Sequence, residues 1–383
     1  MNNKADVIVI GAGIIGLSIA HELLKRGRSV LLLEKEKMPG MGETSKATGG
    51  IRLQFSSEDN IKLSLLSRER YLNFDKEFGL GIDFYQQGYL FMAIKPEHLE
   101  KLRQGGKLQK RLGVKTEFLT IAEVKRIMPA MKTDDILGGS ICRQEGHADP
   151  SLAVQGYVKE VKQLGGVIVE DREVIAFLIR DKKVYGVTTA QGDFMAPVVI
   201  NAAGPFSAKV AALAGIDLPI TAHKRHVMVT APLEAVPDNL PLVIDMESGW
   251  YMKKENRGGI IMGGTDRKNL PADNDLVDQP SLYGIIEAAV SRVPVLAEAH
   301  IVTSFAGLRS MSPDDHAILG QVSAVSGFYC AAGFSGHGFM HAPAVGMIMA
   351  DLIIQGKTNV INMDNFSPER FLKVNSVKET YVF

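Results

Sequence analysis

The stretch that decides the fold is Asp6-Val-Ile-Val-Ile-Gly-Ala-Gly-Ile-Ile-Gly16, which is followed by Leu17–Arg26 and Ser29–Glu34. Val7–Ile10 is short, apolar and β-branched, as expected of a parallel strand buried on both faces. Leu17–Arg26 has apolar residues at helical spacing, and a second apolar strand then runs to Glu34. A strand, a glycine-rich turn, a helix, a second strand and an acid, in this order, predict a Rossmann-type dinucleotide-binding unit.

Each glycine of the turn has a separate role in such a unit. Gly11 permits the tight turn, Gly13 lets a pyrophosphate approach the backbone, and Gly16 lets the helix pack against the strand. The N-terminus of the helix offers free N–H groups and the positive end of its dipole to phosphates. Glu34 comes 18 residues after Gly16, where a carboxylate accepts hydrogen bonds from ribose hydroxyls. The acid disfavours a 2′-phosphate, so the motif predicts FAD or NAD and argues against NADP.

The composition is that of an ordinary soluble protein with two domains. The chain has 383 residues, of which 46% are apolar and 22% are charged. Lys+Arg and Asp+Glu both total 43, so no basic excess favours nucleic acid or an anionic membrane as a partner. Cys142 and Cys330 are the only cysteines, and their spacing is not that of metal ligands. This usage favours reduced cytoplasmic thiols, and we predict no metal site.

The start of the chain and its apolar runs indicate no targeting or membrane segment. The sequence reads Met1-Asn-Asn-Lys-Ala-Asp6 and enters the first strand directly, so no signal peptide is expected. No run reaches the roughly 18 consecutive apolar residues of a membrane span. We therefore expect a soluble, cytoplasmic protein.

Beyond Glu34 the chain alternates between the first unit and segments of mainly antiparallel sheet. A loop of small residues, Met38–Gly50, follows the acid, and Val198–Pro205 is a second buried strand that ends on small residues. Helices are predicted at Asn60–Phe78 (with Ser56 or Ser57 as cap), Leu99–Leu112, Ile121–Ile127, Ser151–Leu164 and Ala342–Ile354. Antiparallel strands are predicted within Ile82–Ala93 and at Val174–Ile179, Val184–Thr189, Thr221–Thr230, Gly249–Lys253 and Gly259–Gly263.

Six segments, taken in order, resemble landmarks of the D-amino-acid-oxidase/glycine-oxidase (DAO) superfamily of FAD enzymes. They are Gly11–Glu34, Thr44–Ile51, Ala148–Pro150, Val198–Pro205, Gly307–Asp314 and Gly333–Phe339. The likeness covers essentially the whole chain. Gly49–Phe55 and Gly333–Gly346 look most like the β subunit of heteromeric L-proline dehydrogenases and sarcosine oxidases.

The resemblance implies an α/β fold with two interleaved domains. A Rossmann-type, glutathione-reductase-like FAD-binding domain takes residues 1–85, 143–217 and 310–383. An antiparallel-sheet substrate domain takes residues 86–142 and 218–309. The substrate is expected where the two domains meet.

By resemblance the cofactor is FAD, bound without a covalent bond because Gly307 stands where covalent relatives have a cysteine. The predicted cofactor-binding residues are Gly11, Gly13, Ile14, Ile15, Gly16, Glu34, Lys35, Ser45, Ala47, Thr48, Gly49, Gly50, Ile51, Val174, Ala203, Gly204, Gly307, Arg309, Gly336, His337, Gly338 and Phe339. Val174 would pair its backbone with adenine. Gly336–Phe339 would run along the flavin ring, where backbone N–H groups stabilise the negative charge of the reduced flavin.

Three residues are predicted to act on the substrate: Arg52, Tyr251 and His337. Arg52 matches an arginine that grips the substrate carboxylate in related amine oxidases; its alternative is a surface or ion-paired arginine. Tyr251 matches an active-site aromatic residue, and His337 lies in the loop that faces the flavin. Arg309 either contacts flavin or substrate or forms a structural ion pair, and His341 either faces the pocket or packs in the core.

In this superfamily the substrate amine, as the free base, gives a hydride or its equivalent from Cα to flavin N5, and the imine hydrolyses. Ile260–Gly263 lacks the lysine that activates oxygen in monomeric sarcosine oxidases, which favours a dehydrogenase that passes electrons onward. Met340 replaces a lysine that helps to hold the carboxylate, so carboxylate binding rests either on Arg52 or on a group that the sequence does not reveal. Heterotetrameric relatives bind FMN between subunits through a histidine. Ala148 takes that place here, beside His147, so an FMN would be non-covalent and would need a partner subunit.

We therefore expect an FAD-dependent dehydrogenase or oxidase of an amino acid or amine, with proline-like or sarcosine-like substrates first. Two other classes stay open. One is an FAD-dependent 2-hydroxy-acid dehydrogenase on the same scaffold, and the other is a non-catalytic, FAD-holding subunit of a larger complex. The expected partners are the small-molecule substrate and further subunits of an oligomer, which can include a different chain.

Overall fold

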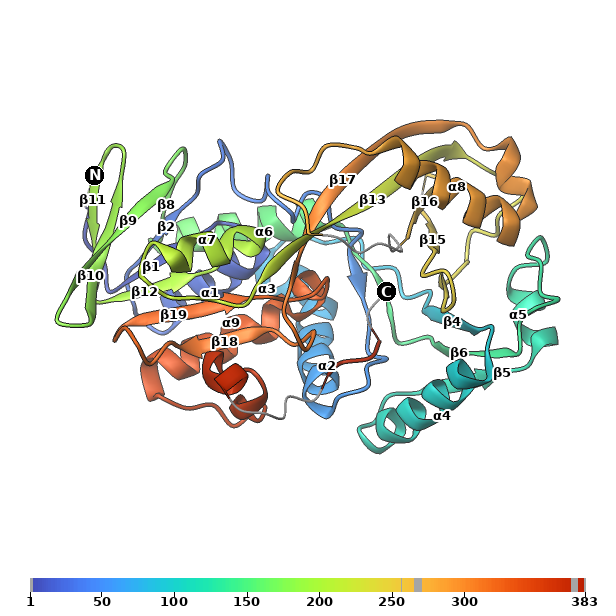
Figure 1. The fold of residues 1–383 in the computed structure, drawn as a ribbon, viewed down its shortest axis with the longest axis horizontal. Helices are drawn as coiled ribbons and strands as arrows, with labels where there is room; N and C mark the ends of the chain where they lie inside the picture. Colours follow the sequence, from blue (N-terminus) through green and yellow to red (C-terminus); the bar gives the residue numbers. More distant parts are fainter. Residues whose placement is uncertain (1–2, 256, 265–270, 373–377, 382–383) are drawn as a thin grey trace.

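The computed structural model describes residues 3–255, 257–264, 271–372 and 378–381. Figure 1 shows two lobes, one built on a six-stranded sheet and the other on an eight-stranded sheet. The long strands β13 (Thr221–Pro232) and β17 (Ile301–Met311) lead from the junction of the lobes into the second lobe. The predicted α/β class with a Rossmann-type sheet and an antiparallel sheet is confirmed.

The six-stranded sheet has the order β18-β19-β12-β1-β2-β8, and only the β18–β19 pair is antiparallel. Its strands are β1 (Val7–Ile10), β2 (Val30–Leu33), β8 (Val167–Val169), β12 (Val198–Asn201), β18 (Ile318–Gln321) and β19 (Phe328–Ala332). β1 lies between β12 and β2. The glycine-rich turn therefore opens at the carboxyl edge of the sheet, in its middle, where α/β folds bind dinucleotides.

This sheet is buried on both faces, which accounts for its continuously apolar strands. Val7 and Val9 face a core formed with α1, α6 and α9, and Ile8 and Ile10 face a core formed with a three-stranded sheet and α7. The helices are α1 (Ile14–Lys25), α6 (Pro150–Gln163), α7 (Ser207–Ala212) and α9 (Gly338–Gln355). The three-stranded sheet consists of β9 (Val174–Arg180), β10 (Lys183–Thr189) and β11 (Gly192–Met195).

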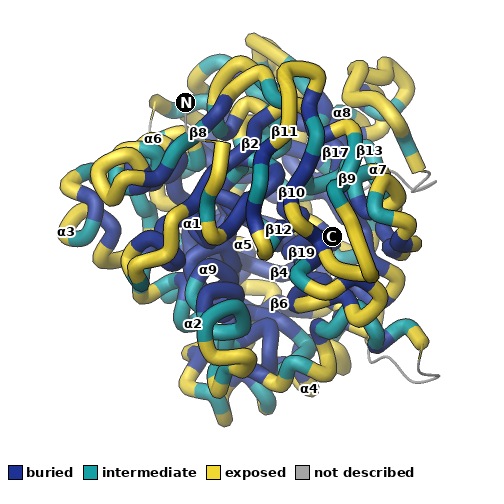
Figure 2. The backbone as a smooth tube through the Cα atoms, turned by 90° about the vertical axis from the view of Figure 1, so that its left-hand side faces the viewer, coloured by how far each residue is buried: buried dark blue, intermediate teal, exposed yellow. Residues whose placement is uncertain are grey.

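The helix α9 is a core helix of the first lobe. Among the described residues it is the one helix long and apolar enough to cross a membrane, but 61% of its apolar window is buried inside the protein. It packs against α1 and α2 (Glu58–Leu72), and Figure 2 shows it as a dark-blue segment behind the outer elements. Its apolar composition is therefore explained by packing.

The eight-stranded sheet has the order β17-β13-β16-β15-β14-β4-β6-β5, and only the β14–β4 pair is parallel. Besides β13 and β17, its strands are β4 (Tyr89–Ala93), β5 (Thr116–Leu119), β6 (Gly138–Cys142), β14 (Leu242–Asp245), β15 (Tyr251–Lys254) and β16 (Gly259–Gly263). The helices of this lobe are α4 (Pro96–Arg111), α5 (Ile121–Ile127) and α8 (Gln279–Arg292). The described residues also form four short 3-10 helices: η1 (Gly204–Phe206), η2 (Pro294–Glu298), η3 (Met363–Asn365) and η4 (Pro368–Leu372).

Two predicted elements differ from the structure. The helix predicted at Asn60–Phe78 is two helices, α2 and α3 (Phe74–Phe78), separated at Asn73. The amide of Asn73 donates to the carbonyl oxygen of Glu69 at 2.9 Å, and such a local bond competes with the helix. Of Ile82–Ala93, only β4 is a strand.

A short two-stranded sheet joins the regions on either side of β4. It pairs β3 (Gly50–Ile51) with β7 (Gly146–His147) in antiparallel fashion. This pair holds the end of the loop 38–50 next to the segment that leads into α6. Arg52 follows β3 directly, so the small sheet determines where its backbone lies.

Candidate active site

The glycine-rich turn leaves no room for side chains. A Cβ on Gly16 would overlap with the carbonyl oxygen of Gly11, and a Cβ on Gly11 would lie 2.6 Å from that of Ala202. Gly11 also has a φ of +100°, which favours glycine. Gly13 is the N-cap residue of α1, and the N–H of Ile14 donates to Oγ1 of Thr44 at 3.1 Å. The turn is thus the tight cradle that a pyrophosphate needs, and Thr44 is an added polar group there.

Glu34 closes this turn from the end of β2. One carboxylate oxygen accepts from the N–H of Ala12 at 2.7 Å, and the other accepts from the N–H of Glu36 at 2.9 Å. Burial raises the pKa of Glu34, while these two hydrogen bonds lower it. The carboxylate therefore lies beside the cradle, where its remaining lone pairs suit a ribose.

Replacing Glu34 by alanine is expected to weaken FAD retention by about 10- to 100-fold in Kd, because a hydrogen bond to a charged group contributes about 1.5–3 kcal/mol. Flavin content after exhaustive dialysis measures the effect. Glu36→Ala, at a half-buried neighbour whose backbone N–H donor is retained, should keep its flavin. Full occupancy of the Glu34 variant would contradict the assigned role.

Several other predicted cofactor residues lie next to the turn. Ile14 and Ile15 are buried in the first turn of α1. Ala203 and Gly204 follow β12, where the N–H of Ala202 donates to the carbonyl oxygen of Ile10. Farther along, Val174 is the buried first residue of β9.

Three predicted cofactor side chains have partners inside the protein. Nζ of Lys35 lies 3.6 Å from the ring centroid of Phe206. The hydroxyl of Ser45 donates to carbonyl oxygens of its own loop, which also contains Ala47 and Thr48. The ring of Phe339 stacks on Tyr71 with centroids 5.2 Å apart. Contacts from these three residues to a cofactor would therefore come from backbone groups.

The glycines predicted at the flavin ring form a second tight surface. A Cβ on Gly49 would overlap with the carbonyl oxygen of Ala148, and a Cβ on Gly50 would overlap with the hydroxyl of Tyr89. Gly336 has a φ of +91°, and its Cβ would lie 3.0–3.2 Å from the guanidinium of Arg309. Only glycine lets Tyr89 and Arg309 approach the backbone so closely. The tight backbone that the resemblance assigns to FAD is thus present both at the turn Gly11–Gly16 and at these glycines.

Gly307 lies on β17 against the loop 38–50. A Cβ there would lie 2.7 Å from the carboxylate of Glu43, which accepts from the N–H of Leu308 at 2.6 Å. Glu43 and Lys46 also form an ion pair. These contacts tie the loop that follows Glu34 to the second lobe.

Arg52 is buried, with 4% of its surface exposed. Its Nη2 donates to the carbonyl oxygen of Tyr381 at 2.7 Å and lies 3.1 Å from Nε2 of His337. Its guanidinium carbon lies 4.2 Å from the ring centroid of Phe55. Nη1 is buried and has no hydrogen-bond partner among the residues that the structure describes. Buried guanidinium nitrogens are normally paired, so Nη1 is an open donor for an acidic ligand.

His337, the N-cap residue of α9, serves as an acceptor for Arg52. Burial and the charge of Arg52 hold the pKa of His337 well below its usual range. The imidazole is therefore neutral, with Nε2 unprotonated and the proton on Nδ1. His341 is buried and hydrogen-bonds to Ser64 at 2.9 Å, and its ring lies 5.9 Å from that of His337.

Two tyrosines line the same region, one predicted and one missed. Tyr251 begins β15, with its hydroxyl against Gly263, and burial raises its pKa while the charges of Arg309 and Arg225 lower it. Tyr89 on β4 was not predicted, and burial raises its pKa as well. Both phenols are therefore neutral donors at physiological pH.

Sequence reasoning also missed two buried carboxylates that hold the chain around Arg52. Glu145 accepts from the N–H groups of Leu53 and Gln54 at 2.5 and 2.6 Å. Glu379 accepts from the N–H groups of Ser56 and Ser57 at 2.9 and 3.1 Å. Neither acid lies in a recognisable motif, and only their burial in the fold reveals them.

Comparison with known proteins identifies the family. The sequence profile of the DAO family, described as FAD dependent oxidoreductase, matches residues 6–352. This chain belongs to the DAO family. The L-proline dehydrogenase from P. horikoshii superposes on this DAO-family chain with a TM-score of 0.92 and 32% identity, over 98% of this chain and 100% of that one. The glycine oxidase from Geobacillus kaustophilus has the same fold, with a TM-score of 0.86 and 23% identity over 96% and 99% of the two chains.

Among curated proteins, mouse mitochondrial sarcosine dehydrogenase is 28% identical over 93% of this DAO-family chain. The aligned part is 40% of the mouse protein, so this chain spans about two fifths of that relative. The family membership makes the protein an FAD-dependent oxidoreductase, as predicted.

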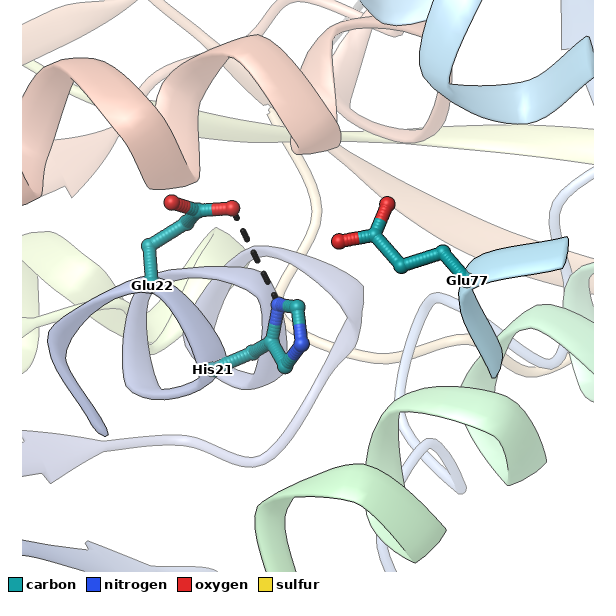
Figure 3. A group of neighbouring side chains, drawn as sticks. All are labelled: His21, Glu22 and Glu77. Carbon is teal, nitrogen blue, oxygen red and sulfur yellow. Dashed lines mark ion pairs between the residues drawn. The ribbon is translucent and has the colours of Figure 1, made fainter. Parts of the chain in front are cut away.

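The described residues contain one group of three side chains with the spacing of metal ligands: His21, Glu22 and Glu77. Figure 3 shows them near the junction of α1 and α3. Cations already neutralise both carboxylates, since Arg70 lies 2.9 Å from Glu22 and 2.7 Å from Glu77, and Lys25 lies 2.8 Å from Glu77. We therefore assign the group to an ion-pair network that joins α1, α2 and α3.

Stability of this DAO-family protein is expected to fall between pH 7.5 and pH 5 through its buried histidines. Burial lowers the pKa of His21 to about 4 and those of His147 and His341 to about 3. Only the unfolded chain binds protons at these sites near pH 6.5, so their stabilisation is present above that pH and is lost below it. Glu145, whose pKa burial raises to about 7, acts in the opposite direction.

His341→Gln isolates one of these contributions. Urea titrations at pH 7.5 and pH 5 give the free energy of unfolding at each pH. Its decrease between these pH values should be about 2 kcal/mol smaller in the variant than in the wild type. Equal losses in both proteins would contradict the depressed pKa of His341.

Proposed function

We propose that this chain oxidises an amino acid or secondary amine that carries a free carboxylate, of the proline or sarcosine type. The reaction is the oxidation of the substrate C–N bond to an imine, which then hydrolyses in water, and bound FAD would supply the acceptor for the hydride that leaves Cα. The observation that carries the proposal is Nη1 of Arg52, which is buried and has no hydrogen-bond partner in the described part of the chain, two residues after a glycine that the resemblance assigns to the flavin site. It supplies the donor that a substrate carboxylate requires.

The residues around this donor favour an anionic substrate with a neutral amine. Arg52 and Arg309 are buried guanidiniums, which stay charged, and His337 and His341 are neutral. Two nearby positive charges stabilise a carboxylate and disfavour an ammonium group, whereas the carboxylates of Glu145 and Glu379 near Arg52 are already bound by backbone N–H groups. The free base, whose lone pair assists loss of the hydride from Cα, is therefore favoured in the bound state.

The tyrosines complete the substrate site in this proposal. Neutral Tyr89 and Tyr251 offer hydroxyl groups for orientation and rings for contact with an aliphatic substrate. The names of the relatives support the same substrate class, since one is an L-proline dehydrogenase and another a sarcosine dehydrogenase. The residues act by binding and orientation, which accounts for the lack of a nucleophile among the proposed substrate contacts.

Anaerobic titration of the holoenzyme tests the proposal. L-Proline or sarcosine should abolish the absorption band of oxidised flavin, while 2-hydroxyglutarate should leave it unchanged. Reduction by 2-hydroxyglutarate alone would instead establish a hydroxy-acid dehydrogenase. No reduction by any of the three compounds would favour a non-catalytic, FAD-holding subunit.

We further propose that the electrons pass to an acceptor other than oxygen, in a cytoplasmic complex with a different subunit that binds FMN non-covalently beside Ala148. The support is the resemblance, the lack of a lysine in Ile260–Gly263, and the buried Nε2 of His147, which has no hydrogen-bond partner in the described part of the chain. Co-purification from the native source, with flavins identified by mass, tests this assembly. Recovery of a chain that carries only FAD and has no partner would contradict it.

A further inference from the structure

The segment Lys378–Tyr381, here called the strap, contacts Arg52 through the backbone carbonyl of Tyr381. It reaches the N-terminus of α2 through Glu379 and the core beside β4 through Tyr381. Nothing in the sequence motifs points to it, because it lies after the last segment that resembles the DAO superfamily. Its contacts nevertheless lead directly to the guanidinium proposed to bind the substrate.

Glu379 is the first anchor of the strap. It is fully buried, and its carboxylate accepts from the backbone N–H groups of Ser56 and Ser57, from both hydroxyls, and from the amide of Asn60. Burial raises its pKa, but these hydrogen bonds, together with the one from the N–H of Tyr381, more than offset burial and leave the pKa lowered. Ser57 is the N-cap residue of α2, yet its side chain does not cap the helix, so the charged carboxylate of Glu379 takes the capping role.

Tyr381 is the second anchor. Its ring packs edge-on against Phe91, with centroids 5.7 Å apart, and its hydroxyl donates to the carbonyl oxygen of Lys101 at 3.0 Å. The residue is 2% exposed. With its ring and hydroxyl held in this way, Tyr381 places its backbone carbonyl oxygen 2.7 Å from Nη2 of Arg52.

The hydrogen atoms of Arg52 can then be assigned. Nη2 carries two, and its two partners are the carbonyl oxygen of Tyr381 and Nε2 of His337. Nη1 also carries two, and it has no partner among the described residues. The strap and His337 together hold the Nη2 side of the planar group, and the Nη1 side is unpaired within the described ranges of the chain.

We propose that the strap is a positioning element that orients Arg52, so that Nη1 is the arm that binds the carboxylate of the substrate. This inference rests on the proposed function and adds to it a segment remote in sequence. Without the strap, Nη2 loses one acceptor and the guanidinium is free to turn away from the ligand. Carboxylate binding should then weaken, although the cofactor site is intact.

The test uses the FAD-loaded full chain and pyrrole-2-carboxylate, which has a carboxylate and a ring N–H but no hydride to give. Its Kd follows from the change it causes in the flavin absorption spectrum. Glu379→Ala combined with Tyr381→Ala should raise this Kd at least tenfold. The Kd of the neutral analogue pyrrole-2-carboxamide should change less than twofold, because a general loosening of the pocket would weaken both ligands.

Two further variants grade the effect. Lys378→Ala removes an exposed partner of Asp315 and keeps both anchors, so it should bind like the wild type. Tyr381→Phe keeps the ring and the backbone carbonyl but loses the bond to Lys101, so its Kd should lie between those of the wild type and the double variant. Hydrogen exchange at the N–H groups of Ser56 and Ser57, which donate to Glu379, shows whether the strap has left its site. Faster exchange is expected in the double variant.

The outcomes separate this inference from the proposed function. A wild-type protein that binds pyrrole-2-carboxylate, and a double variant that binds it equally well, would overturn the role of the strap alone. A wild-type protein that neither binds the carboxylate nor is reduced by proline or sarcosine would overturn both. If the double variant does not fold, Tyr381→Ala alone decides by the same criterion.

Discussion

Arg52→Ala is expected to raise the Kd of a carboxylate substrate by roughly 30- to 1000-fold while leaving the FAD content unchanged. Loss of one partner of a buried, hydrogen-bonded charge pair costs about 2–4 kcal/mol, and each 1.4 kcal/mol is about tenfold. The side chain hydrogen-bonds to the carbonyl oxygen of Tyr381 and to His337, neither of which belongs to the glycine-rich turn. Anaerobic substrate titration and flavin content measure the two quantities separately.

Arg52→Lys is the matched control for charge. Lysine keeps the positive charge but lacks the planar fork that contacts Tyr381 and His337 while presenting Nη1. We expect an intermediate Kd, well above that of the wild type. If Arg52→Ala instead loses FAD at wild-type substrate affinity, then Arg52 belongs to the cofactor site and the proposed substrate contact is wrong.

Gly16→Ala is expected to yield a protein with little FAD. Its Cβ would overlap with the carbonyl oxygen of Gly11 and lie 3.2 Å from Cγ1 of Val9, so the turn or the helix must move. Such overpacking costs about 1–3 kcal/mol. Where this cost destabilises the FAD-bound protein relative to the apoprotein, the Kd of FAD rises by about 5- to 150-fold. Flavin titration of the apoprotein measures the change.

Gly284→Ala provides the control for this glycine. It lies on α8 in the other lobe, and a Cβ there meets no atom within 4 Å. This variant should bind FAD like the wild type. Wild-type affinity in Gly16→Ala would show that the turn can relax, and the close packing of α1 on β1 would not be needed for the cofactor.

The sequence predicted most of the first lobe because its signals are local. The apolar run of β1, the turn Gly11–Gly16 and the spacing of α1 lie within a few residues of one another, and each follows from sterics and periodicity. The break at Asn73 was missed because one side-chain bond to the backbone decides it against a helical pattern that continues on both sides.

Sequence motifs predicted one residue of the candidate site, Arg52, and missed another, Tyr89. Arg52 was predicted from a motif, but its burial, its bond to His337 and its open Nη1 are properties of the fold. Tyr89 was missed because an aromatic residue in a strand is ordinarily a packing residue. Its contact with Gly50 exists only because β4 lies beside β6 and the β3–β7 pair.

By itself, the sequence determined that this protein has a Rossmann-type cradle without room for side chains, since backbone conformation and helix spacing are local properties. Only the tertiary structure decided what surrounds Arg52. Tyr381 reaches it from 329 residues away, and Glu145 holds the backbone of Leu53 from 92 residues away. Contacts between such distant residues depend on how whole lobes pack, and no local pattern in the chain encodes them.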